Sequence, residues 1–170
     1  MKKALVVIDM QNDFIDGSLG TPEAQAIVLA VTEKVKAALK NGEKLIFTQD
    51  THHKDYLASA EGKKLPVEHC IKPTHGWGLA SALIPFAKDA VVLEKPTFGA
   101  TGLPQLVADC DEITVVGLCT DICVISNAML LKSFLPEARI CVDSECCAGV
   151  TPESHTRALE AMKMCHIEVL

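Results

Sequence analysis

Short apolar segments that alternate with helix-length segments limit the possible folds of this chain more than any other feature. Ala4 to Ile8 is a continuous apolar run, and Glu23 to Lys40 carries apolar residues at helical spacing before Asn41 and Gly42 end it. A second apolar run, Lys44 to Thr48, follows. Strands that are apolar throughout and alternate with helices are typical of a parallel sheet covered on both faces. This order predicts a Rossmann-like, three-layer α/β/α sandwich.

The alternation continues to the last residue and predicts a mostly parallel sheet of roughly six strands. The remaining strand segments are Ala90 to Leu93, Glu112 to Val116, Arg139 to Val142 and His166 to Leu170. The remaining helical segments are Leu103 to Ala108 with Pro104 in its first turn, a stretch that opens at Thr120 and runs to Leu131, and Pro152 to Met164 with Thr151 as its N-cap. A chain of 170 residues fits a single domain, residues 1–170.

The composition favours a small-molecule ligand. Hydrophobic residues make up 49% of the chain, but the longest apolar runs are far shorter than a membrane span. A formal net charge of -6 argues against binding to nucleic acid or to an anionic membrane, because both need a basic surface. Met1, Lys2 and Lys3 lead directly into the first strand segment, so we expect a cytoplasmic protein without a cleaved signal.

Reactive or metal-binding side chains follow four of the predicted strands. In sheets of this kind the functional site lies outside the carboxyl ends of the strands. The residues found there are Asp9 after the first strand, Asp50 and His52 after the second, Lys95 after the third, and Cys119 and Cys123 after the fourth. We therefore expect these side chains to converge at one edge of the sheet.

The connection from Thr51 to Leu79 interrupts the alternation. It is polar, shows little periodicity, and carries four of the six histidines. A loop of this length inside a compact domain is more often functional than idle. We expect it to contain short helical turns and to contribute to the site.

Two of the eight cysteines mark a candidate nucleophile. Cys119 and Cys123 lie in the stretch Gly117 to Asn127, where a strand passes through a tight turn into a helix. Unpaired N–H groups in the first turn of a helix favour a thiolate over a thiol. Placement favours Cys123 over Cys119 only weakly, and we expect the other cysteines to be reduced and mostly packed in the core.

Acyl transfer to a cysteine needs an ionised thiol or a nearby base, and it needs donors for the developing oxyanion. Asp9 could accept the thiol proton, Lys95 could hold the charges together, and backbone amides around Cys119 and Cys123 could form an oxyanion hole. Taken singly, Asp9 is better explained as a turn cap and Lys95 as a surface lysine. Their expected convergence favours the catalytic interpretation.

The sequence resembles the isochorismatase-like cysteine hydrolases, and among them the nicotinamidases. Five motifs carry the resemblance in order along the chain: VVIDMQNDF at Val6 to Phe14, TQDTH at Thr48 to His52, LPVEHC at Leu65 to Cys70, EKPTFGAT at Glu94 to Thr101, and VVGLCTDICV at Val115 to Val124. The resemblance implies Asp9 and Lys95 as catalytic partners and selects Cys123 as the nucleophile. It also implies a cis peptide between Leu118 and Cys119, which aims the amides of Cys119 and Cys123 at the substrate oxygen.

The resemblance also implies a divalent metal site beside these residues. Asp50, His52 and His69 match its ligands, and a carboxylate with imidazoles suits zinc, with iron or manganese as alternatives. A further ligand varies in the family between His and Glu, and Glu61 is the candidate here. His53 competes for that role, but adjacent residues rarely direct both side chains at one ion.

The expected substrate pocket departs from the family pattern. Nicotinamidases commonly carry an aromatic residue where this chain has Leu65, beside Phe14. Trp77, the only tryptophan, is a candidate replacement from the following loop and equally a packing residue.

The resemblance implies an amidohydrolase that converts a small carboxamide, most simply nicotinamide, through a thioester, with the metal orienting the ring nitrogen of the substrate. It also implies a homo-oligomer. The alternatives are a family hydrolase acting on a carbamoyl, ureido or vinyl-ether substrate, or a non-catalytic redox scaffold.

Overall fold

A computed structural model describes residues 1–170 and contains one sheet of six strands, as predicted. The strands are ordered β3-β2-β1-β4-β5-β6, and every neighbouring pair is parallel. Their bounds are β1 Lys3–Ile8, β2 Lys44–Asp50, β3 Val91–Lys95, β4 Glu112–Leu118, β5 Arg139–Ala148 and β6 Glu168–Val169. In this doubly wound order the direction of winding reverses between β1 and β4, and the crevice there is where ligands bind.

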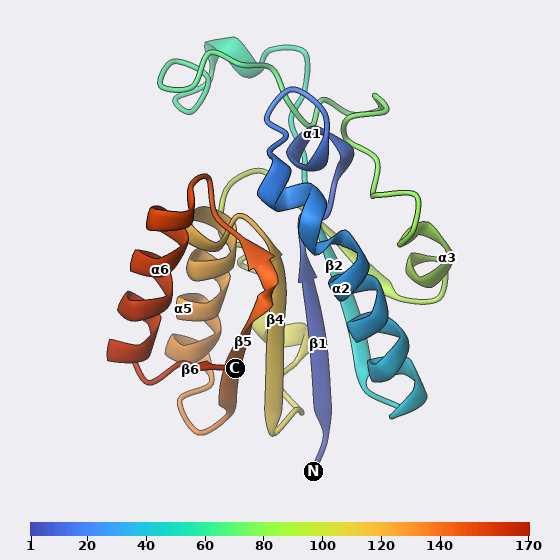
Figure 1. The fold of residues 1–170 in the computed structure, drawn as a ribbon, viewed down its shortest axis with the longest axis vertical. Helices are drawn as coiled ribbons and strands as arrows, with labels where there is room; N and C mark the ends of the chain where they lie inside the picture. The colour runs from blue at the N-terminus through green and yellow to red at the C-terminus, as the bar shows by residue number, and fades with distance from the viewer.

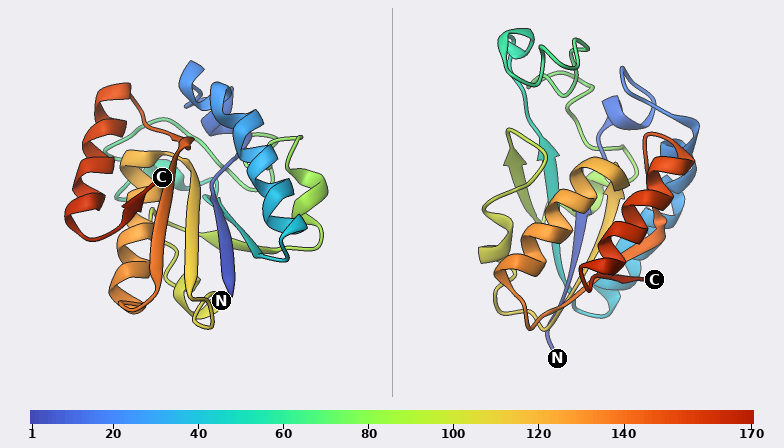
Figure 2. Two further views of the ribbon diagram at one scale, coloured as in Figure 1. Left: turned by 60° about the horizontal axis from the view of Figure 1, so that its bottom comes forward. Right: turned by 90° about the vertical axis from the view of Figure 1, so that its left-hand side faces the viewer.

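Helices cover both faces of the sheet, which confirms the three-layer sandwich (Figure 1). The helices are α1 Asn12–Ile15, α2 Pro22–Lys40, α3 Ile84–Ala87, α4 Leu103–Leu106, α5 Ile125–Phe134 and α6 Pro152–Met164. Figure 2 shows α5 and α6 on one side of the sheet, with α2 and α3 on the other.

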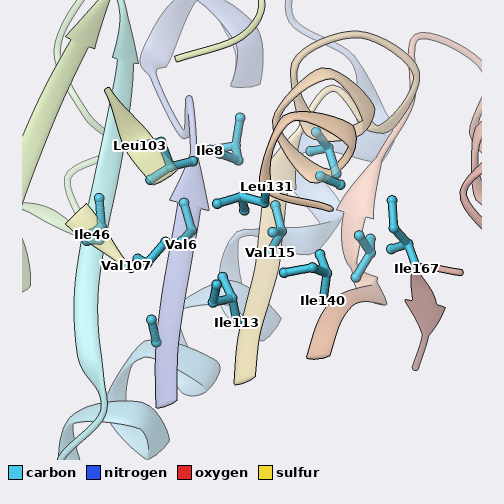
Figure 3. Close-up of a cluster of buried hydrophobic side chains, with 14 of the residues drawn as sticks. Val6, Ile8, Ile46, Leu103, Val107, Ile113, Val115, Leu131, Ile140 and Ile167 are labelled. Atoms are coloured by element: carbon cyan, nitrogen blue, oxygen red, sulfur yellow. The ribbon is translucent and has the colours of Figure 1, made fainter. Parts of the chain in front are cut away.

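The core consists of two apolar clusters, one on each face of the sheet. Figure 3 shows the first, in which strand residues such as Val6 and Val115 pack against Leu131 of α5 and Leu103 of α4. The second is formed largely by α2, through Ile27, Val31 and other buried residues of its inner face. The inner strands β1 and β4 are buried on both faces, which explains why their sequences are apolar without alternation.

The caps of the two longest helices follow the sequence pattern. Thr21 accepts a hydrogen bond from Ala24 N at 3.0 Å at the start of α2. Thr151 begins α6 with a capping box that it shares with Ser154, and Asn41 ends α2. These side-chain contacts satisfy N–H groups that have no partner within the helix, so the helix bounds are encoded locally.

Several predicted bounds were wrong. β5 continues to Ala148 rather than ending at Val142, because a register shift beside Gly117 lets it pair with β4 again at Cys147. The closing strand contains only Glu168–Val169. The helix after β3 ends at Leu106 rather than Ala108, and α1 and α3, each of four residues, were not predicted.

The connection from Thr51 to Leu79 lies above the carboxyl ends of the strands (Figure 1). It contains one short helical turn, η1 at Tyr56–Ala58, in agreement with the expectation. His52 N donates to Cys70 O at 3.0 Å, so this hydrogen bond closes a loop from His52 to Cys70 within the connection. This arrangement places the histidines of the connection over the edge of the sheet where the reactive residues were expected.

At the opposite end of the sheet, ion pairs join the first residues of neighbouring strands. Glu112 of β4 accepts hydrogen bonds from Lys3 of β1 and from Arg139 of β5, both at 2.7 Å. These two bonds lower the pKa of the Glu112 carboxyl below its ordinary value. No helix of the chain has the length and apolar character that crossing a bilayer requires.

Candidate active site

The expected convergence at the carboxyl edge of the sheet is found. Asp9 follows β1 immediately, whereas Asp50 and Lys95 are the last residues of β2 and β3. Asp9 has a backbone φ of 46°, a left-handed conformation that aspartate tolerates better than most residues. Its N–H donates to Thr48 O at 3.3 Å and its carboxylate accepts from Thr48 Oγ1 at 2.6 Å. These bonds anchor the residue after β1 to the neighbouring strand β2.

Lys95 connects the candidate nucleophile with the acidic residues. Its Nζ lies 2.7 Å from Asp9 Oδ2, 3.3 Å from Asp50 Oδ1 and 3.5 Å from Cys123 Sγ. All four residues are buried, and Lys95 is only 2% exposed. The geometry therefore brings the predicted Asp9, Lys95 and Cys123 together around one ammonium group.

The buried charges perturb one another. Burial raises the pKa of Asp9, although the Lys95 ammonium opposes the rise. Burial opposes the charged form of Lys95, but the neighbouring Asp9, Cys123 and Asp50 raise its pKa above the ordinary value. A carboxylate of raised basicity, paired with a protonated lysine, is suited to accept a proton from a neighbouring thiol.

The surroundings of Cys123 do not favour the expected thiolate. Burial, with the negative charge of Asp9, raises the pKa of Cys123 well above its ordinary value, and Lys95 offsets this only in part. The reason is that Cys123 lies inside a π-helical turn, η2 at Thr120–Val124, in an almost dry site. Desolvation there outweighs the helix N-terminus, so the resting residue is a thiol that needs a base.

The turn between β4 and η2 presents backbone donors. The peptide bond between Leu118 and Cys119 is cis, as the resemblance implies. Cys119 O accepts hydrogen bonds from Ile122 N at 3.0 Å and Val124 N at 3.1 Å, whereas the Cys119 N–H donates to no group of the protein. Burial raises the pKa of the Cys119 thiol to about 12, and no lysine offsets that effect. The unpaired N–H of Cys119 and the contact of the Cys123 sulfur with Lys95 agree with the separate roles expected for the two cysteines.

The four predicted metal ligands form one cluster. Asp50, His52, Glu61 and His69 each direct a ligand atom to a region in which these atoms all lie within 4.8 Å of one another. His52 Nε2 is 3.0 Å from Asp50 Oδ2, and Glu61 Oε1 is 3.7 Å from both histidine Nε2 atoms. Two imidazoles and two carboxylates, three of them buried, fit a divalent transition metal.

The cluster is supported by residues around it. His69 Nδ1 lies 2.8 Å from Val67 O, so an Nδ1–H can donate to this carbonyl while Nε2 faces the cluster. The ring of buried Tyr56 packs 4.7 Å from that of His52 and 4.9 Å from that of His69. His53, the competing candidate, is exposed and lies outside the cluster.

Two supporting residues were missed in the sequence, and Gln11 is the clearer one. Its Nε2 donates to Asp50 O at 2.9 Å, and its Oε1 accepts from Asp50 N at 2.7 Å. The side-chain amide thereby pairs with the backbone of Asp50 as another strand would. The sequence feature that could have indicated this role is a glutamine two residues after Asp9, within the motif from Val6 to Phe14. Tyr56, the second, had no signal beyond its place in a histidine-rich loop.

A cavity of about 220 Å³ opens above Cys123, and most of the residues lining it are apolar. Phe14 and Leu65 line it as expected, but Trp77 does not. Trp77 Nε1 instead donates to Thr51 Oγ1 at 2.9 Å, and Lys72 Nζ lies 5.0 Å from the centre of its ring. These contacts hold the indole inside the loop and correct its predicted place in the pocket.

Phe98 supplies the aromatic ring that the sequence interpretation assigned to Trp77. It lines the cavity with 44% of its surface exposed. The available signal was its place three residues after Lys95, in the loop that leaves the functional edge of the sheet. The other residues around the cavity are Leu19, Thr21, Asp50, Glu61, His69, Cys119, Ile122 and Val150.

Curated relatives match the chain over nearly its whole length. An isochorismatase family protein of Bacillus subtilis, PncA, is 31% identical over 94% of this chain and 93% of its own. The nicotinamidase/pyrazinamidase of Mycobacterium tuberculosis is 27% identical over 99% of this chain and 98% of its own.

Solved structures share the fold. The pyrazinamidase of Pyrococcus horikoshii, determined in complex with zinc, has a TM-score of 0.88 and 25% identity, covering 100% of this chain and 99% of its own. The pyrazinamidase/nicotinamidase of Streptococcus mutans has a TM-score of 0.89 and 28% identity, covering 99% and 100%. The family model described as the isochorismatase domain matches residues 3–170. The motifs, the doubly wound sheet and these similarities together show that the chain belongs to the isochorismatase family.

Proposed function

We propose that this protein is a cysteine amidohydrolase that converts nicotinamide, or a closely similar aromatic carboxamide, to the acid and ammonia. The observation that carries the proposal is the contact of one buried ammonium, that of Lys95, with both Asp9 and Cys123 beneath an apolar cavity. Relatives with nicotinamidase and pyrazinamidase names, at 23% to 27% identity over nearly the whole chain, support the same substrate class.

The reaction begins with proton transfer from the Cys123 thiol to Asp9. The sulfur attacks the carboxamide carbon, and the carbonyl oxygen gains the electron pair of the broken π bond. The amides of Cys119 and Cys123 are the proposed donors to this oxyanion. When the tetrahedral intermediate collapses, the C–N bond breaks, and ammonia leaves with the proton from Asp9. A thioester to Cys123 remains.

Water then completes the cycle. Asp9 accepts a proton from the water as its oxygen attacks the thioester carbon, and the second tetrahedral intermediate expels the sulfur of Cys123. Asp9 returns its proton to the Cys123 thiolate, and the carboxylic acid is released. Lys95 remains protonated throughout, because it contacts the Asp50 carboxylate as well as Asp9 and Cys123, and these neighbours raise its pKa. The raised pKa of Asp9 suits this alternation between base and acid.

The metal cluster forms one side of the same cavity, since Asp50, Glu61 and His69 belong to both. We propose that Asp50, His52, Glu61 and His69 hold zinc, which the solved pyrazinamidase of Pyrococcus horikoshii also contains. A bound zinc supplies a Lewis acid that can coordinate a ring nitrogen. Asp50 also contacts Lys95 through Oδ1, so this residue links the cluster to the reacting groups.

An apolar cavity of this size suits a single aromatic ring. Phe14 and Phe98 offer ring faces, and Leu65 offers an aliphatic surface. The carboxamide end of such a substrate would face Cys123, where the polar groups are gathered. A cytoplasmic location and a homo-oligomeric assembly stay predictions from the sequence.

Ammonia release from nicotinamide tests the proposal. Replacing Cys123 with Ala removes the sulfur and is expected to abolish turnover. Cys119→Ala is the matched control, because it removes the neighbouring thiol and keeps the backbone amide, so its activity is expected to stay within about threefold of wild type. Full activity of the Cys123 variant would disprove the mechanism.

Two further measurements distinguish the alternatives. A panel of carbamoyl and ureido compounds, scored by ammonia release, separates this substrate class from others of the family. Iodoacetamide labelling that nicotinamide blocks at Cys123 is expected of a catalytic thiol. Reversible oxidation of several cysteines, without ammonia release from any amide, would favour a redox scaffold instead.

A further inference from the structure

Asn127 makes hydrogen bonds that no step of the proposed reaction uses. It lies in α5, is completely buried, and is the fourth residue after Cys123. Its Nδ2 donates to Cys123 O at 2.8 Å and to Phe98 O at 3.0 Å, and its Oδ1 accepts from Ala100 N at 2.8 Å. One side-chain amide thus joins the helix that carries the candidate nucleophile to the loop that follows Lys95.

Asparagine is an unfavourable choice for the inside of a helix, because its side chain competes with backbone hydrogen bonding. A buried amide also loses free energy unless its donors and acceptor are paired. At this position both amide protons and the oxygen have partners, two of them in the loop. The contacts to the loop therefore account for a residue that neither helix formation nor core packing favours.

The loop that follows Lys95 contacts this lysine and also lines the cavity. Lys95 Nζ donates to Thr97 O at 3.0 Å, and the next residue, Phe98, lines the cavity. Phe98 is 44% exposed, so packing only partly restrains its side chain. The position of its backbone then decides where the ring lies, and Asn127 binds that backbone at Phe98 O and two residues later at Ala100 N.

We propose that Asn127 is a positioning residue that holds Phe98 against the ring of the substrate. It thereby fixes the position of the Phe98 side of the cavity relative to Cys123. It does not touch the reacting atoms. The inference rests on the proposed function for the identity of the substrate. It predicts that Asn127 controls the affinity for an aromatic amide much more than the rate of the bond-breaking steps.

The test uses Asn127→Ser. A serine hydroxyl can still donate to the carbonyl four residues earlier, that of Cys123, but it is too short to bridge the loop. We expect KM for nicotinamide to rise about three- to tenfold, the range expected for a lost aromatic contact, and kcat to change by less than about twofold. In a Phe98→Ala background the same substitution is expected to leave KM unchanged. An equal rise in KM in both backgrounds would overturn the proposal.

A matched control and a second variant keep the test decisive. Ser126→Ala removes a hydrogen bond from the neighbouring residue of α5, from Ser126 Oγ to Ile122 O of η2, without affecting a hydrogen bond of the loop, and is expected to leave KM at the wild-type value. Should Asn127→Ser unfold, Asn127→Thr offers the same hydroxyl on a bulkier side chain and is read in the same way. A thermal scan of each variant establishes that it is folded before its kinetics are compared.

Hydrogen exchange separates failure of this inference from failure of the proposed function. The Ala100 amide donates to Asn127, so without substrate it is expected to exchange at least tenfold faster in Asn127→Ser than in wild type. If the wild-type enzyme releases no ammonia from nicotinamide, only the proposed identity of the substrate is refuted. Unchanged Ala100 exchange in a folded Asn127→Ser variant would refute the proposal that Asn127 positions the loop, whatever the substrate.

Discussion

Gly117 offers a sharp test of how the fold positions the site. This residue of β4 has a backbone φ of 117° and pairs with Ile8 of β1, directly before Asp9. A Cβ at Gly117 would overlap the carbonyl oxygen of Ile8 and would lie 2.9 Å from its nitrogen. The obstacle is backbone in the middle of the sheet, which can move only if the strands separate. Gly117→Ala is therefore expected to disturb both folding and catalysis.

The magnitude follows from two contributions. An alanine in such a conformation carries a strain of about 1 to 2 kcal/mol. Forcing a methyl group into a packed region adds about 1 to 3 kcal/mol. Gly117→Ala is thus expected to lower the free energy of unfolding by about 2 to 5 kcal/mol. Gly42→Ala is the matched control: its φ is 70°, but no atom lies within 4 Å of the new Cβ, so only the strain of about 1 to 2 kcal/mol remains.

Urea unfolding, extrapolated linearly to water, measures the two stabilities, and ammonia release measures kcat. A displacement of Ile8 moves Asp9 relative to Lys95, and a shift of about 1 Å can reduce the rate about 100-fold. We expect the kcat of folded Gly117→Ala to fall at least tenfold and that of Gly42→Ala to match wild type. Equal destabilisation by the two substitutions, or a normal kcat for Gly117→Ala, would refute this reasoning.

Three other predictions concern the metal, the pH dependence of stability and the tryptophan. His69→Ala is expected to lower the bound metal per chain, measured by elemental analysis, whereas His53→Ala is not; equal losses would exclude the proposed ligand set. The ion pairs of Glu112 hold its pKa down, so their stabilisation is present above the unfolded-state pKa of about 4.3 and is lost as the pH falls through the folded-state value. Glu112→Gln is expected to be less stable than wild type at pH 7, by at most about 1 kcal/mol because the two cations are partly exposed, and equally stable near pH 3; a difference that persists in acid would contradict this. Trp77→Phe loses one hydrogen bond, to Thr51, and is expected to lower the free energy of unfolding in urea by about 1 kcal/mol. Its KM for nicotinamide is expected to stay unchanged, and a raised KM would indicate that the indole contacts the substrate.

Local signals predicted the elements whose bounds depend on neighbouring residues. Helix α6 begins at the predicted residue because Thr151 caps it and Pro152 suits its first turn, and it also ends at the predicted Met164. The end of β5 was missed because its pairing resumes only after the register shift at Gly117, and no feature within β5 encodes the partner strand. The short helices α1 and α3 lack the length over which periodicity can be recognised.

The candidate site divides in the same way. Asp9 and Lys95 were predictable because parallel strands carry their carboxyl ends to one edge, where the site of such folds lies, whereas the choice of Cys123 over Cys119 came from the family resemblance. The ionisation of Cys123 was not predictable, since the balance between the helix N-terminus and desolvation depends on how dry the assembled site is. Phe98 was missed because its role depends on which way one loop folds over another.

The sequence by itself determined that the sheet is parallel and which residue types lie at its carboxyl edge, because apolar periodicity and strand ends are properties of short segments. Only the tertiary structure decided that Glu61 rather than His53 completes the metal cluster, and that Phe98 rather than Trp77 lines the cavity. The physical reason is that these side chains lie on long connections, whose paths depend on contacts with residues far away in the chain. Hydrogen bonds such as those of Asn127 to Phe98 and Ala100 fix those paths, and no local pattern encodes them.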